Sequence, residues 1–237
     1  MVRKIRKKGL KDYYSESWNY ICDSKRFIYF IVGFFVFFML VGLLVPVSGE
    51  FEEKILQYIS ELLAMTEGLS QWGLVRFILW NNVQSSFFGV VLGIFLGVFP
   101  LISSLVNGYI LGFVLLRAIE VEGPLTVLRL APHGIFELPA LFISLGLGLK
   151  LGWWLITDPF RFYWKRHKLV SFLFIFSYLI TLVVALVIDD KFRKKMKKSF
   201  DSFRENFWNS IITFVLIILP LLIVAAIIEG TLIFFSG

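Results

Sequence analysis

The chain has 237 residues, of which 58% are hydrophobic and 17% are charged, and its mean hydropathy is +0.80. This composition lies far from that of a soluble domain, so it predicts a protein that is mostly buried in lipid. The formal net charge of +7 is interpreted as membrane topology and lipid contact, and nothing in the pattern favours nucleic-acid binding. The single cysteine, Cys22, excludes an intrachain disulfide and a multi-cysteine metal site.

Six apolar runs lie along the chain, each close to or above the roughly 20 residues that cross a bilayer as a helix. The runs cover residues 27–47, 74–99, 101–119, 131–156, 169–188 and 210–235. The first is longer than the apolar core of a cleaved signal peptide and ends without a small-x-small cleavage site, so we expect an anchor. A tight turn at Pro100 separates the second run from the third. The sequence therefore predicts an all-α integral membrane protein with about six hydrophobic helices in one membrane domain, residues 1–237.

Basic residues predict the orientation of the first four helices. Residues 1–26 carry eight Lys and Arg, whereas residues 48–72 carry one lysine and five glutamates. Because the cytoplasmic flanks of membrane helices are enriched in Lys and Arg, we expect a multi-pass protein of the cell membrane with a cytoplasmic N-terminus and an acidic outer segment at 48–72. Four further basic residues between positions 161 and 168 agree with this orientation after four crossings.

The fifth run does not fit this rule. If residues 169–188 cross the membrane, residues 189–209, with seven Lys and Arg, lie on the outer side. Either this loop is an exception, or the run lies partly in the membrane without crossing, although it has no Gly or Pro to form a hairpin. Six helices are the preferred interpretation, and the orientation of the last two is left open.

Two basic segments have an amphipathic pattern. Residues 190–209 repeat apolar side chains at helical spacing, and we expect this basic helix at the level of the headgroups, in contact with anionic lipid. A solvated basic linker is the alternative. The cations of the segment are Lys191, Arg193, Lys194, Lys195, Lys197 and Lys198. The N-terminal segment 1–26 shows the same pattern, with apolar positions at Leu10, Tyr14, Trp18 and Ile21.

The outer segment 48–72 also contains an amphipathic stretch. Its apolar stripe consists of Ile55, Ile59 and Leu62. Acidic residues back this stripe, namely Glu52, Glu53 and Glu61. The pattern predicts a short acidic helix that rests on the membrane or on a partner.

Glycine recurs at four-residue spacing in the second, third and fourth runs. Such faces let two helix backbones approach closely, which favours helix association in lipid. We therefore expect these three runs to form the packed core, either within the chain or across a dimer. The residues are Gly89, Gly93, Gly97, Gly108, Gly112, Gly148 and Gly152.

Polar residues fall in the same three runs. If the second and fourth runs both point inward, Asn81 and Asn82 share the outer third of the bilayer with His133 and Glu137. Asn107 enters from the inner side, so we expect it to hydrogen-bond within the helix packing rather than to join the other four.

Glu137 has two interpretations, because a carboxylate in hydrocarbon needs a partner or water. With His133, one helical turn away, it could bind a proton or a cation in a cavity. Alternatively both are structural: Pro132 is suited to a first helical turn, where Glu137 would meet the positive end of the helix dipole and His133 would cap the helix or lie among the headgroups. The structural alternative is preferred. Glu229 in the last run poses the same question, and Lys150 is expected to reach the cytoplasmic surface.

The sequence contains no complete catalytic set. A zinc peptidase needs His-Glu-x-x-His on a helix, whereas His133 has only His167 as a second histidine. No Gly-x-Ser-x-Gly elbow, glycine-rich phosphate loop or pair of intramembrane aspartates occurs. We therefore expect a protein without enzymatic activity, cofactor or metal.

Several motifs, in this order, resemble the stage II sporulation protein M family. They are Asn81-Asn82 before a glycine-rich run, Asn107-Gly108, Pro132-His133-Gly134, Phe136-Glu137-Leu138-Pro139-Ala140, Pro220-Leu221-Leu222 and Ala225-Ala226-Ile227-Ile228-Glu229-Gly230. The resemblance covers most of residues 70–157 and 205–235. It implies a polytopic membrane protein without established chemistry, whose best-known bacterial relatives help to assemble cell-wall-degrading proteins during engulfment in sporulation. The run 169–188 departs from the shorter family pattern.

Two functions from different classes are consistent with the sequence. The first is a non-enzymatic scaffold or assembly factor that organises envelope or membrane proteins through the acidic outer segment. The second is a channel, transporter or transporter subunit that uses the buried Glu, His and Asn side chains, within the chain or at the seam of a homodimer.

Overall fold

The computed structural model describes residues 8–45, 49–164 and 190–236, and these ranges contain helices and turns but no strand. In chain order the elements are α1 (Leu10–Leu44), α2 (Glu50–Ala64), α3 (Gln71–Val91), the 3-10 turn η1 (Leu92–Ile94), α4 (Val98–Glu122), α5 (Thr126–Trp164), α7 (Asp190–Thr213), the π-helical turn η2 (Phe214–Ile218) and α8 (Leu219–Ser236). Five helical stretches among the described residues are long and apolar enough to cross a bilayer, namely Leu10–Leu44, Gln71–Ile94, Val98–Glu122, Gly134–Leu155 and Lys197–Phe235. The prediction of an all-α membrane protein is confirmed, whereas the predicted run 169–188 lies outside the described residues.

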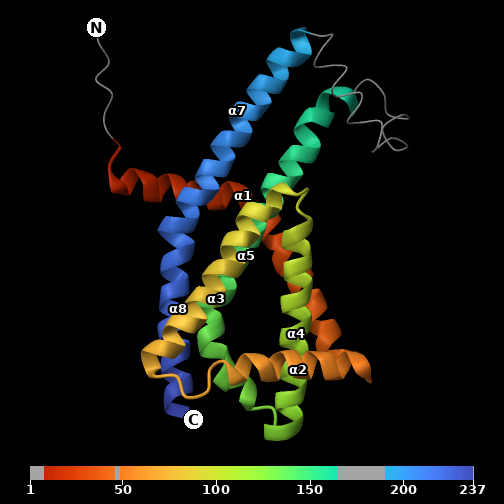
Figure 1. The fold of residues 1–237 in the computed structure, drawn as a ribbon. Coiled ribbons are helices and arrows are strands. Elements are labelled where there is room, and N and C mark those ends of the chain that lie inside the picture. The colour runs from red at the N-terminus through yellow and green to blue at the C-terminus, as the bar shows by residue number, and fades with distance from the viewer. Residues whose placement is uncertain (1–7, 46–48, 165–189, 237) are drawn as a thin grey trace.

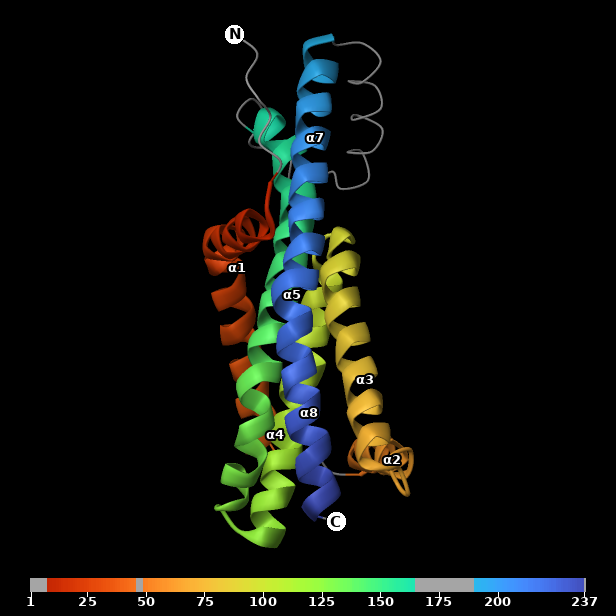
Figure 2. The same ribbon diagram turned by 90° about the vertical axis from the view of Figure 1, so that its left-hand side faces the viewer.

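The long helices pack into a bundle that has a helical segment lying across each end (Figure 1, Figure 2). The first half of α1 lies across one end, after which α1 changes direction and runs along the bundle. The short helix α2 lies across the opposite end. We call these ends the α1 end and the α2 end. The chain reaches the α1 end again through α5 and returns to the α2 end through α7 and α8.

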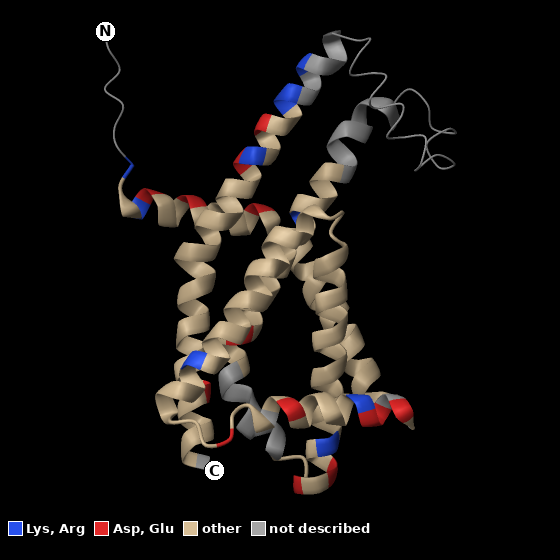
Figure 3. Ribbon diagram, in the orientation of Figure 1, with Lys and Arg blue, Asp and Glu red and all other residues tan. Residues whose placement is uncertain are grey.

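Charged residues gather at the two ends, and the band between them is mostly uncharged (Figure 3). Because α5 ends and α7 begins beyond the α1 end, the basic residues of α7 lie at the same end of the bundle as the start of α1. The acidic helix α2 lies at the other end. If residues 169–188 crossed the membrane, the basic segment 189–209 would lie on the opposite side from the other basic segments. In the described bundle the basic residues of α7 lie on the same side as the start of α1, so this conflict does not arise.

The basic segment 190–209 is part of a longer helix. α7 continues through η2 into α8, and it projects past the α1 end roughly along the bundle (Figure 1). This corrects the expectation of a separate helix lying flat among the headgroups. The chain has no Gly or Pro between residues 190 and 219 to interrupt the helix. The wider turn of η2 lies directly before Pro220, whose ring would crowd a carbonyl of the preceding turn in a regular helix.

The turn between α3 and α4 precedes the predicted position. α3 ends at Val91, and α4 begins at Val98 after η1 and a turn that closes at Gly97, where φ is +71°. Pro100 therefore lies in the first turn of α4, where a missing N–H costs no intrahelical hydrogen bond. The prediction of a turn at Pro100 is wrong by a few residues because both glycine and proline mark turns, and the glycine closes this one.

Two glycine-lined seams hold the long helices together. In the first, α1 packs on α4, and a Cβ added at Gly108 would lie 2.5 Å from the carbonyl oxygen of Phe35. Gly112 faces the backbone of Met39 in the same way, and Gly42 of α1 faces Tyr109. The α1–α4 seam is therefore a backbone-to-backbone contact in which no side chain larger than hydrogen fits at these glycines.

The second seam joins α5 to α3 and η1. Gly148 faces the backbones of Gly89 and Gly93, and Gly152 faces Gly93 and Gly97. Added Cβ atoms at all seven glycines singled out in the sequence would come closer than 3.0 Å to an atom of another helix or turn of the same chain. The close approaches occur within the chain, so the glycine faces give no argument for a dimer.

α5 is the central helix. About half of its most apolar window is buried, a larger share than in any other long helix described. Leu147 and Leu151 of α5 have no exposed surface. They belong to the same core cluster as Ile218 of η2 and Leu222 of α8. Side chains on α5 therefore meet neighbours from α1, α3 and α8 at different heights of the bundle.

Candidate functional site

Glu137 lies in the interior of α5. The helix begins at Thr126, so Pro132, His133 and Glu137 all follow its first turn. Because the helix dipole acts mainly within the first turn, it does not explain the carboxylate of Glu137. The expected helix start at Pro132 is therefore wrong, and so are the dipole account of Glu137 and the capping role of His133, whereas a structural role for the two residues stays a prediction. The side chain of His133 lies outside the described residues.

Glu137 of α5 and Glu229 of α8 approach each other, so that the charge of Glu137 acts on Glu229. The Oε2 atom of Glu229 is buried and has no hydrogen-bond partner among the described residues. Nearby, α3 and α8 are in direct contact, since Gln71 donates a hydrogen bond of 3.2 Å to the hydroxyl of Thr231 and Gly230 packs on Val75. The α2 half of the bundle thus contains two carboxylates from two helices, one of which has a buried oxygen without a hydrogen-bond partner among the described residues.

The asparagines of α3 and α4 are not hydrogen-bonded to these carboxylates in the described part of the chain. Asn81 is exposed, whereas the Nδ2 atom of Asn82 is buried without a hydrogen-bond partner in the described part of the chain. Within the same ranges, no hydrogen bond joins either asparagine to Glu137. Asn107 lies on α4 and donates to the carbonyl and hydroxyl oxygens of Ser103 at 2.8 and 3.3 Å. Asn107 is exposed and hydrogen-bonds to its own helix, so these bonds do not lie within the packing between helices, where they were expected.

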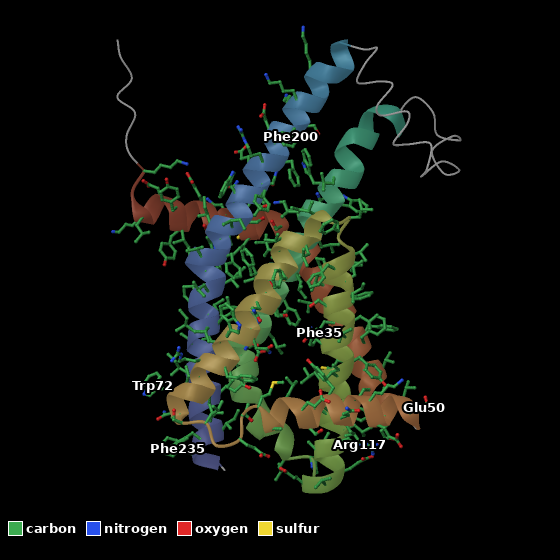
Figure 4. The ribbon with its side chains drawn as sticks, in the orientation of Figure 1. Phe35, Glu50, Trp72, Arg117, Phe200 and Phe235 are labelled. Carbon is green, nitrogen blue, oxygen red and sulfur yellow. The ribbon has the colours of Figure 1, made fainter. Side chains whose placement is uncertain are left out.

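The acidic segment that was expected on the outer side contains α2, which is attached to the bundle. Glu52 of α2 forms an ion pair with Arg117 of α4, which also binds Glu120 at 2.8 Å (Figure 4). Ile55 is buried, with 8% of its surface exposed, and the rest of the predicted stripe, Ile59 and Leu62, is half-buried. Glu53 and Glu61 are exposed on the same helix. α2 therefore packs its apolar stripe inward and presents carboxylates outward.

The cations of α7 occupy its projecting part. Lys194, Lys197 and Lys198 are exposed. Arg204 lies 3.8 Å from Asp201 on the same helix. The side chains of the remaining predicted lipid contacts, Lys191, Arg193 and Lys195, lie outside the described residues.

A hydrogen-bonded network at the α1 end was missed by the sequence analysis. Tyr20 of α1 donates from its hydroxyl to the carbonyl of Asn206 at 3.0 Å and lies 3.1 Å from the hydroxyl of Ser210. Ser24, one turn later, donates to the carbonyl of Tyr20 at 2.6 Å and accepts a hydrogen bond of 2.9 Å from Lys150 of α5. The network joins α1, α5 and α7. Lys150 was the only member of the network that the sequence analysis singled out. Because this lysine was expected to reach the cytoplasmic surface, its hydrogen bond to the buried Ser24 was not predicted.

Comparison with protein families matches residues 27–232 to the family described as stage II sporulation protein M. The match extends through the stretch 169–188, which was expected to depart from the family pattern. Comparison with curated proteins and with solved structures finds no match. Since the family match covers most of the chain, this membrane protein belongs to the stage II sporulation protein M family.

Proposed function

We propose that this protein is a non-enzymatic scaffold or assembly factor of the cell membrane, which presents α2 to envelope proteins on the outer side. The observation that carries the proposal is the attachment of α2. Buried Ile55 and the Glu52–Arg117 ion pair fix the helix across the bundle end, while Glu53 and Glu61 stay exposed. A fixed helix with outward carboxylates is complementary to a partner that presents Lys or Arg.

The proposed orientation has the α1 end in the cytoplasm. The distribution of charge supports it, because the basic residues at the start of α1 and in α7 share one end of the bundle, and the acidic α2 lies at the other (Figure 3). Cys22, the single cysteine, is exposed near the α1 end. In intact cells it should resist a membrane-impermeant maleimide, whereas a cysteine at position 53, in a Cys22→Ser background, should react. The reverse labelling pattern would overturn the orientation.

Recovery of partners tests the scaffold. The full chain carries an affinity tag, is cross-linked in membranes and is recovered in detergent, and co-purifying proteins are quantified by mass spectrometry. In the double variant Glu53→Lys, Glu61→Lys, the charges facing the partner are reversed, so recovery should fall roughly tenfold or more. Glu67→Lys, at an exposed carboxylate just beyond α2, is the matched control and should leave recovery unchanged. Recovery of every partner at the wild-type level in the double variant would refute the role of α2.

Proton or cation transport is the second candidate, and a specific observation favours it. Glu137 and Glu229 approach each other from two helices, and Glu229 Oε2 and Asn82 Nδ2 are buried without hydrogen-bond partners among the described residues. Carboxylates inside apolar helices often mark ion pathways. Proton flux in proteoliposomes should then be lost in Glu229→Gln and kept in Asn107→Ala, because Asn107 bonds only within α4. Flux that is the same in Glu229→Gln, Glu137→Gln and the wild type would remove both carboxylates from any pathway.

A further inference from the structure

Among the described residues, Lys150 is a cation without an anionic hydrogen-bond or ion-pair partner. It lies on α5, beside Tyr20 and Ser24 in the first half of α1. Its Nζ donates to the hydroxyl of Ser24 at 2.9 Å and lies 3.8 Å from the centre of the Tyr20 ring. Among the described residues no carboxylate forms an ion pair with it, and the charged groups near enough to act on it are Asp23 and Arg26. An ammonium held in an apolar helix without an anion is costly.

The packing of α5 against α1 explains why Lys150 lies there. Gly146, one turn earlier, faces the backbone of Ile28, and a Cβ at this position would lie 2.9 Å from the Cα of Ile28. The two helices therefore approach closely just before Lys150, which brings the ammonium against Ser24. Ser24 and Tyr20 are in turn fixed by hydrogen bonds within α1 and to α7. Contacts from three helices thus determine the position of the cation.

The free hydrogen-bonding capacity of Lys150 indicates the kind of ligand. An ammonium has three N–H donors, and one of them is used by Ser24. Arg26, on the α1 segment beside Ser24, is exposed, and its guanidinium lies 5.1 Å from the centre of the Phe27 ring. Two cations with unused donors are typical of a site for phosphate oxygens, which accept charge-assisted hydrogen bonds from Lys and Arg.

We propose that Lys150, Ser24 and Arg26 form a binding site for a phosphate group, and that the group belongs to an anionic phospholipid of the leaflet at the α1 end. The site lies at the depth of lipid headgroups, because the first half of α1 crosses the bundle here and exposes Tyr14 and Trp18. The phosphate supplies the hydrogen-bonded anion that Lys150 lacks among the described residues. The proposal is independent of the proposed function, since the site and α2 lie at opposite ends of the bundle.

Native mass spectrometry of the full chain tests the site. The protein in detergent is titrated with phosphatidylglycerol, with phosphatidylcholine as the neutral lipid, and with inorganic phosphate as competitor. The wild type should bind phosphatidylglycerol at least about tenfold more tightly than phosphatidylcholine. Lys150→Met, which keeps the side-chain length and removes the charge, should weaken phosphatidylglycerol binding about tenfold, since a charge-assisted hydrogen bond is lost. Lys54→Gln, at an exposed lysine of α2 at the opposite end of the bundle, should bind like the wild type.

Lys150→Arg distinguishes the loss of a charge from misfolding, and inorganic phosphate distinguishes a lipid site from a site for a soluble phosphate compound. Lys150→Arg should keep most of the binding, which distinguishes a missing charge from a misfolded α5, and circular dichroism should show the same helix content in every variant. Competition by millimolar inorganic phosphate would assign the site to a soluble phosphate compound and overturn its assignment to lipid. Equal binding of phosphatidylglycerol by the wild type, Lys150→Met and Arg26→Gln would overturn the site itself.

Discussion

The α1–α4 seam can be tested with one added methyl group. In Gly108→Ala the new Cβ would lie 2.5 Å from the carbonyl oxygen of Phe35 and 3.3 Å from its carbonyl carbon. Ordinary contact begins near 3.4 Å, so α1 and α4 must separate by roughly 1 Å along this line. A gap of that size removes a quarter to a half of the dispersion energy of each contact it opens. Overpacking of this kind typically costs about 1–3 kcal/mol, and we expect a loss of free energy of unfolding in that range.

Helix α1, on the other side of this seam, provides a matched control. Gly33 lies on α1 with no atom within 4 Å of an added Cβ, so Gly33→Ala makes the same chemical change without the clash. Alanine is better than glycine in a helix by up to about 1 kcal/mol, so Gly33→Ala should leave stability unchanged or raise it slightly. The free energy of unfolding is measured for both variants by titrating the protein in mild detergent with dodecyl sulfate and following circular dichroism. If Gly108→Ala is as stable as Gly33→Ala, the helices are not in backbone contact at this seam, and the reasoning is refuted.

The remaining predictions use the polar contacts at the two ends and the buried carboxylates. Tyr20→Phe removes the donor to the carbonyl of Asn206 and should lower the free energy of unfolding by about 1 kcal/mol; an unchanged value would show that the network contributes nothing. Arg117→Gln releases Glu52 and should speed amide hydrogen exchange in α2, whereas Arg204→Gln, whose ion pair lies within α7, should not. Glu229→Gln removes an ionisable group whose Oε2 atom is buried without a hydrogen-bond partner among the described residues. Because a buried carboxylate is costly, the variant should raise the stability of the fold in the same dodecyl sulfate titration, and a loss of stability would show that the carboxylate stabilises the fold.

The pattern of hydrophobic runs was sufficient to predict the long helices but not all of their ends. Apolar length determines which stretches can cross a bilayer, and five of the six runs correspond to described helices. The start of α5 was missed because Pro132 has the local chemistry of a first helical turn. The helix begins earlier, at Thr126, directly after the turn at Gly123 and Pro124, where Gly123 has a φ of +85°. The Gly123-Pro124 pair could have indicated a helix start at this point. It was not used because the charged Arg129, which follows it, interrupts the apolar run.

The partners of polar and small residues could not be predicted, because they depend on which helices are neighbours. The spacing of the glycines showed that some helix faces allow close backbone contact. The positions of Phe35 and Gly93 show that helices of the same chain make this contact. Lys150 was similarly ambiguous, since a long side chain in an apolar run can reach solvent or find a buried partner. Ser24 and Tyr20 were not distinguishable by spacing from the other polar residues of the N-terminal segment. Their role depends on the bend of α1, for which the sequence has no glycine or proline near residue 24.

Charged side chains are partly exposed at the α2 end and hydrogen-bonded to buried groups at the α1 end. This difference determines which controls each functional proposal needs. At the α2 end, the Glu52–Arg117 pair is partly exposed, so it contributes mainly to the position of α2 and little to stability. At the α1 end, Lys150 donates a hydrogen bond to the hydroxyl of Ser24, which is fully buried, so removal of the charged group disturbs a network that joins three helices. Changes to exposed carboxylates on α2 should therefore alter binding while the fold is kept. Changes at Lys150 alter binding and packing together, which is why the phosphate site needs the Lys150→Arg comparison and the α2 surface does not.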